Sequence, residues 1–67
     1  MNQLKAGQIR WDETNKYLYM IIEEDDEDID MWKVLSLVCF VDVFVPMEYM
    51  VYHRDSMEWD EVFDEPS

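Results

Sequence analysis

The sequence predicts a mainly β protein, a small twisted antiparallel sheet with a short C-terminal helical turn. Residues 8–12 alternate polar with apolar side chains, which is typical of a half-buried strand. Residues 31–45 are dense in valine, which favours β structure. The chain has 67 residues, of which 49% are hydrophobic and 15% aromatic. This size and composition indicate one small folded domain rather than a disordered chain.

The strands are expected in a simple order. In the first, Ile9 and Trp11 share one face, and the polar residues of 8–12 share the other. The polar residues 12–16 predict a hairpin turn. Residues 17–22 predict a central strand, because both of its faces are apolar. A helix is the alternative for residues 31–45, but their β-branched side chains favour strand, with a bend, bulge or glycine-free turn near residues 40–43.

The C-terminal third contains one signal that ends a strand and one that begins a helix. Pro46 lacks an N–H donor, so we expect it to break the ladder before a further strand at residues 49–53. Asp55 lies three residues before Glu58, a spacing similar to a capping box. A short helical turn there would bring Trp59, Val62 and Phe63 to one side. The alternative is a final strand whose one face carries Met57, Trp59, Glu61 and Phe63.

Charge limits the class of partner. Seventeen acidic residues against five Lys and Arg give a net charge of −12. Direct binding to nucleic acid or to an anionic membrane is excluded, because phosphate binding needs basic side chains. The expected partner is a basic protein surface. Residues 31–47 are apolar but short for a membrane span of about 20 residues, and residues 1–7 lack the apolar segment of a signal peptide.

The single cysteine, Cys39, has no intramolecular disulfide partner and lies in an apolar run. We expect a buried, reduced thiol in a cytoplasmic protein. No enzyme signature, cofactor site or metal site is predicted. Asp26, Asp28 and Asp30 alternate as in a calcium loop, but Met31 stands where the turn glycine belongs.

The main candidate site is the segment 23–30, in which seven of eight residues are carboxylates. We expect a solvated loop or a bulged strand end. Among the aromatic residues, Trp11 and Trp32 are assigned to the core, and Trp59 is the candidate for an exposed anchor. The predicted partner-binding residues are Glu23, Glu24, Asp25, Asp26, Glu27, Asp28 and Asp30, with Glu58, Trp59, Asp60 and Glu61.

Two resemblances follow from these residues. The segment Gly7-Gln8-Ile9-Arg10-Trp11, the Tyr-rich strand after it and Trp59-Asp60 near the end resemble the layout of SH3-like small barrels. In charge, size and aromatic content the chain is similar to phage-encoded DNA-mimic inhibitors, which share no motif. That class includes inhibitors of uracil-DNA glycosylase, restriction enzymes, CRISPR nucleases and nucleoid proteins.

The second resemblance implies an inhibitor, not an enzyme, that blocks the basic nucleic-acid-binding cleft of a host nuclease, glycosylase, nucleoid protein or polymerase in the bacterial cytoplasm. The alternative is an SH3-like interaction or assembly module. Its acids would serve solubility, and residues 31–45 or 49–53 would accept a partner strand. Both a monomer and a homodimer remain open.

Overall fold

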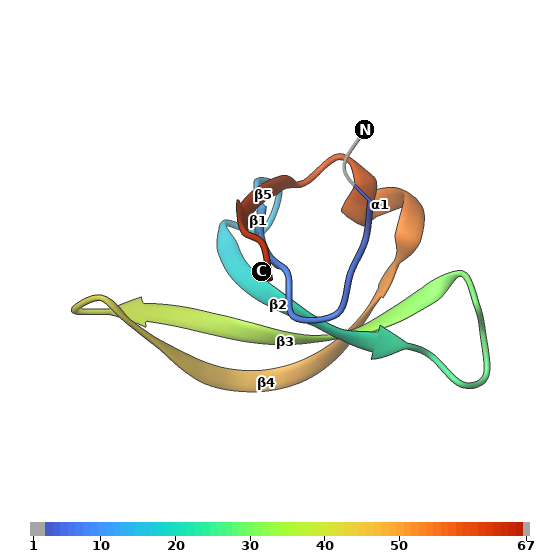
Figure 1. Ribbon diagram of the computed structural model, residues 1–67, viewed down its shortest axis with the longest axis horizontal. Coiled ribbons are helices and arrows are strands. Elements are labelled where there is room, and N and C mark those ends of the chain that lie inside the picture. Colours follow the sequence, from blue (N-terminus) through green and yellow to red (C-terminus); the bar gives the residue numbers. More distant parts are fainter. Residues whose placement is uncertain (1–2, 67) are drawn as a thin grey trace.

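The computed structural model describes residues 3–66. The elements are β1 (Ile9–Asp12), β2 (Tyr17–Glu24), β3 (Met31–Phe40), β4 (Val43–His53), α1 (Arg54–Glu58) and β5 (Glu61–Asp64). The strands form one antiparallel sheet in the order β4-β3-β2-β1-β5. The sheet curls so that β1 and β5 lie above β2, with α1 beside them (Figure 1). The prediction of a mainly β protein with a short helical turn is confirmed.

Strand β1 has both faces covered, which corrects the prediction of a half-buried strand. Gln8 and Arg10 are fully buried, and Asp12 is buried as well. The cause is distant in sequence, because β5 pairs with β1 and α1 brings Met57 toward the same side. Strand β2 lies between β1 and β3, as its two apolar faces predict.

The core consists of two apolar clusters on opposite faces of the sheet. One contains Tyr19, Ile21, Trp32, Val34 and Met57. The other contains Ile9, Leu18 and Leu37, with Trp11 half-buried against it. The assignment of Trp32 to the core is therefore confirmed, whereas Trp11 lies at the edge of the core.

Strands β3 and β4 form a long hairpin with a two-residue turn at Val41 and Asp42. Both turn residues have positive φ, 50° and 67°, the conformation that two-residue hairpin turns require. The expected glycine-free turn is thus present. Pro46 does not break the ladder as predicted. It lies within β4 opposite Leu37, and β4 is an edge strand, where a missing N–H is tolerated.

Three other predictions are wrong. Cys39 is exposed rather than buried, because its part of β3 extends beyond the core. The N-cap of α1 is His53, whose side chain accepts a hydrogen bond from the Asp55 N–H, so Asp55 lies inside the helix. The helix ends at Glu58, and Val62 and Phe63 belong to β5, so they do not share a helical face with Trp59. The alternative of a final strand holds for residues 61–64 only, because Met57 lies in α1 and Trp59 is its C-cap.

Candidate partner-binding surface

The acidic loop, residues 23–30, joins β2 to β3 at one end of the molecule (Figure 1). Glu23 and Glu24 close β2, where the pairing with β3 shifts register after Ile21, as a bulged strand end predicts. Residues 25–30 then form a compact connection rather than an extended row. Its backbone is fastened by two hydrogen bonds, from Asp25 N to Met31 O (3.0 Å) and from Met31 N to Asp28 O (3.0 Å).

A further hydrogen bond attaches the acidic loop to the helix. The Arg54 N–H, at the start of α1, donates to the Asp30 carbonyl oxygen over 2.8 Å. The Asp28 carboxylate accepts from the Asp30 N–H at 3.0 Å. The loop is thus held by its own backbone and by the first turn of α1, while its carboxylates stay on the surface. Six of the seven acidic residues are exposed, and Asp25 is half-buried.

Lys33 contacts the acidic loop through its ammonium group. Its Nζ lies 3.4 Å from Glu23 Oε1 and 3.7 Å from Asp26 Oδ2. The hydrogen bond to Glu23 and the charge of Asp26 raise the pKa of Lys33. One lysine against seven carboxylates leaves a strong negative field at this end of the molecule.

Two large apolar side chains that neighbour predicted site acids in the sequence are largely exposed. Trp59 is 88% exposed, as expected of an anchor, and it follows α1 directly. Ile29, within the acidic loop, is 71% exposed and was not among the predicted site residues. The sequence could have indicated Ile29 as a contact residue, because it is the one apolar residue within the acidic segment 23–30.

The second predicted acidic group, Glu58, Asp60 and Glu61, contains both exposed and inward-facing carboxylates. Glu58 and Glu61 are exposed and can meet a partner. Asp60 faces inward, because its Oδ2 accepts a 2.6 Å hydrogen bond from the Tyr19 hydroxyl. Burial, and secondarily the charge of Asp12, raises the pKa of Asp60 in spite of that hydrogen bond. Asp60 therefore belongs to the interior, and the sequence alone did not reveal this.

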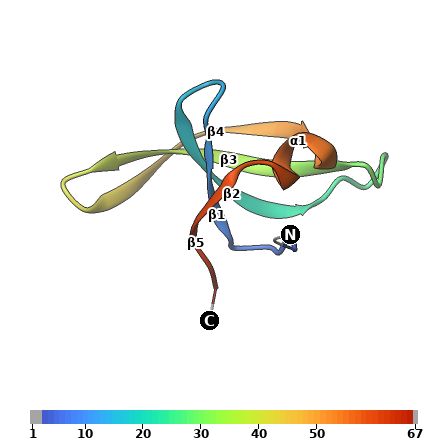
Figure 2. The same cartoon turned by 90° about the horizontal axis from the view of Figure 1, so that it is seen from above.

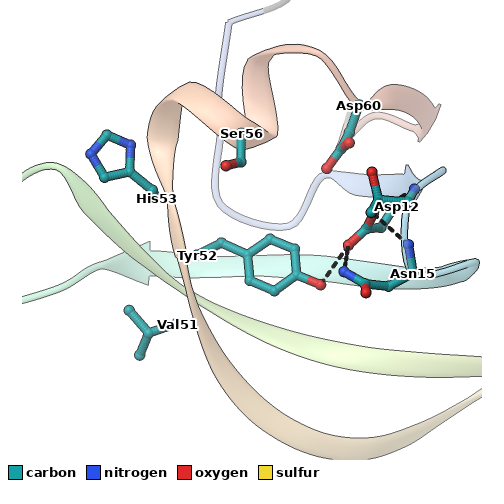
Figure 3. Close-up of a pocket in the computed structure, with 8 residues that line it drawn as sticks. Asp12, Asn15, Val51, Tyr52, His53, Ser56 and Asp60 are labelled. Carbon is teal, nitrogen blue, oxygen red and sulfur yellow. Dashed lines mark hydrogen bonds between the residues drawn. The ribbon is translucent and has the colours of Figure 1, made fainter.

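An open pocket of about 300 Å³ lies beside this interior network (Figure 3). The Asp12 carboxylate accepts hydrogen bonds from the Thr14 and Asn15 backbone N–H groups, from the Asn15 side chain and from the Tyr52 hydroxyl at 2.8 Å. His53 lies on the opposite side of the pocket. Because Asp12 is occupied by these donors, the network fastens the β1–β2 turn to β4 and is structural.

Arg10 is buried and contacts the backbone of Asp60. Its Nε donates to Gln8 Oε1 at 2.6 Å and its Nη1 to the Met57 carbonyl at 2.7 Å. Nη1 also lies 3.3 Å from the Asp60 carbonyl oxygen. A buried guanidinium with several acceptors thus connects β1 to the end of α1 and the start of β5.

The tyrosines around the network stay neutral. Burial, with the nearby charges of Asp12 and Asp60, raises the pKa of Tyr17 to about 12. The pKa of Tyr19 is raised further, mainly by burial and then by its hydrogen bond to Asp60. Neither phenol can therefore act as a base near neutral pH.

Within residues 3–66, no group of three or more His, Cys, Asp or Glu side chains is placed to hold a metal ion. No helix in this range is long and apolar enough to cross a membrane. The chain matches no protein-family model, no curated protein and no solved structure. The fold and the surface thus define a small acidic β protein with a fastened acidic loop.

Proposed function

We propose that this protein is an acidic DNA-mimic inhibitor that occupies the basic nucleic-acid-binding cleft of another protein. The observation that carries the proposal is the acidic loop, where seven carboxylates are matched by Lys33 alone within ion-pair distance among residues 3–66. Arg and Lys that normally grip phosphates can pair with such carboxylates. Attraction between opposite fields makes association fast and sensitive to salt.

The fastening of the loop also supports this proposal. A loop that is held before binding loses less conformational entropy when it docks. The hydrogen bonds of Asp25, Met31 and Arg54 hold its backbone in this way. Ile29 and Trp59 supply apolar contacts that would fix the orientation of the acids in the cleft.

The test is competition with duplex DNA. The protein is used to capture nucleic-acid-binding proteins from bacterial lysate, and DNA binding by each captured protein is then titrated with the inhibitor. Asp25→Asn/Asp26→Asn/Asp28→Asn removes three charges from the acidic loop. Three close charge pairs at about 1 kcal/mol each correspond to roughly 100-fold weaker inhibition.

The matched control removes three exposed charges elsewhere, with Asp42→Asn, Asp64→Asn and Glu48→Gln. It has the same net charge as the loop variant but keeps the acidic loop, so inhibition should stay close to that of the unmodified protein. Equal loss of inhibition in both variants would show that only the total charge matters. Absence of any captured protein that loses DNA binding would refute the proposal outright.

A second candidate function is favoured by a different observation. Strand β4 is an edge of the sheet, and an open edge can accept a partner strand. Its C-terminal half contains residues 49–53, as the alternative of an SH3-like interaction module expects, whereas β3 is enclosed between β2 and β4. Binding by strand addition would survive high salt, and binding through the acidic loop would not.

A further inference from the structure

The outer part of the β3–β4 hairpin extends beyond the rest of the sheet. The pairing of β2 with β3 ends at Leu18 and Leu37, whereas β3 and β4 remain paired up to Phe40 and Val43. Residues 38–45, the hairpin arm, are therefore two-stranded. The arm lies at one end of the molecule and the acidic loop at the other (Figures 1 and 2). On the face opposite to Val38 and Phe40, the arm packs on the rest of the protein through Phe44, whose ring lies 5.7 Å from that of Phe63 in β5.

One face of the hairpin arm is apolar and exposed. Val38 pairs with Val45 and Phe40 with Val43, and because side chains alternate along a strand these four share a face. Met47 adjoins them, since it lines an open groove of about 360 Å³ together with Val38. These five side chains, the arm patch, are each between 41% and 67% exposed.

The arm patch is large for a monomer. Its exposed fractions correspond to on the order of 500 Å² of apolar surface, near the upper end for the largest patch on a monomeric protein. That is about a tenth of the total accessible surface of 4815 Å², which is the share that one partner commonly buries in a specific interface. Two such patches face to face would bury about 1,000 Å² in total, the lower limit for a specific interface, which corresponds to a weak dimer.

We propose that the arm patch is a homodimer interface in which two copies pack arm against arm about a twofold axis. A basic partner is a poor occupant, because the five patch side chains are apolar and the acids adjoining them in sequence are only Asp42, in the turn, and Glu48, which lines the groove with Met47. A second copy brings a surface of the same apolar chemistry, and twofold contacts of this kind are the commonest in soluble oligomers.

Charge repulsion does not prevent this arrangement. Each chain has a net charge of −12, but the acidic loop lies at the end opposite to the arm, and the molecule is 35 Å long. Exposed charges farther apart than about 8 Å are largely screened at physiological salt. The dimer would therefore present two acidic loops at its far ends. This inference does not depend on what the acidic loop binds.

The first test is sedimentation equilibrium of the full chain at 0.15 M and 0.5 M salt. We expect a dimer that is as strong or stronger at the higher salt, the opposite of the response expected for the acidic loop. Phe40→Lys and, separately, Val43→Lys should weaken dimerisation at least 100-fold. The control Tyr49→Lys places the same charge on β4, on the opposite face of the sheet beside Leu35, and should leave dimerisation unchanged. A monomer at all concentrations would overturn the proposal, as would a dimer that resists both arm substitutions.

The second test needs no substitution, so it does not depend on whether the variants fold. Cys39 is the only cysteine and is exposed on the arm, so a spin label there reports the distance between the two arms. Arm-to-arm packing predicts a defined distance shorter than the 35 Å length of one molecule. Contact through the acidic ends would place the labels farther apart than this length and would refute the arm interface.

Discussion

Removal of the buried guanidinium of Arg10 should destabilise the fold more than any other loss of a single positive charge. In Arg10→Met the side chain keeps much of its volume, but Gln8 Oε1 and the Met57 carbonyl lose donors at 2.6 and 2.7 Å. A hydrogen bond to a charged group contributes about 1.5–3 kcal/mol. The two bonds together predict a loss of about 3 kcal/mol or more, a large part of the 5–15 kcal/mol that stabilises a typical domain.

The measurement is urea unfolding followed by tryptophan fluorescence. With a slope near 1 kcal/mol per molar urea for so small a domain, the midpoint should fall by about 3 M. Arg10→Lys keeps the charge but not the planar fork of donors, so its unfolding midpoint should lie between those of the unmodified protein and Arg10→Met. The control Lys5→Met removes the same charge from an exposed residue and should change the unfolding free energy by less than about 0.5 kcal/mol. If Arg10→Met costs no more than Lys5→Met, the network does not connect β1 to α1 and β5 as described.

Three further predictions concern the hydrogen bonds of Asp60 and the N-cap of α1. Tyr19→Phe should cost about 1 kcal/mol through the lost hydrogen bond to Asp60, and because that bond lowers the pKa of Asp60, an NMR titration should show this pKa rise further. Burial raises the pKa of Asp60 above its ordinary 3.8, so the folded state holds this proton more tightly and stability falls as pH rises from 3.8 through the raised value. Asp60→Asn should remove this part of the pH dependence in denaturant titrations, and an unchanged profile would contradict the assignment. His53→Ala should cost about 0.5–1 kcal/mol because the Asp55 N–H loses its acceptor, whereas His53→Asn, with an alternative capping oxygen, should retain most of this stability in thermal unfolding.

Local patterns in the sequence predicted what local physics determines. The apolar faces of residues 17–22 placed β2 in the centre of the sheet, and the run of acids placed a solvated loop after it. The burial of Arg10 could not be predicted in this way. It depends on Met57 and Asp60, 47 and 50 residues away, and alternation within β1 contains no information on them.

The prediction that Pro46 ends a strand failed for a related reason. A proline is excluded from a central strand but accepted at an edge, and the strand order decides which case applies. For the site, the exposed run of residues 23–30 was evident from composition. The inward orientation of Asp60 depended on Tyr19, which belongs to another strand.

The turn at Val41 and Asp42 has a consequence for how the hairpin arm can be tuned. Positive φ is costly for a β-branched residue, and Val41 adopts a φ of 50°. An Asn-Gly pair suits this two-residue turn without strain, and neither position belongs to the arm patch. The rigidity of the hairpin arm can therefore be changed at the turn without changing the side chains of the arm patch. Val41→Asn/Asp42→Gly would slow the local opening of the ribbon, seen as stronger amide protection, and would leave the face that meets a partner chemically unchanged.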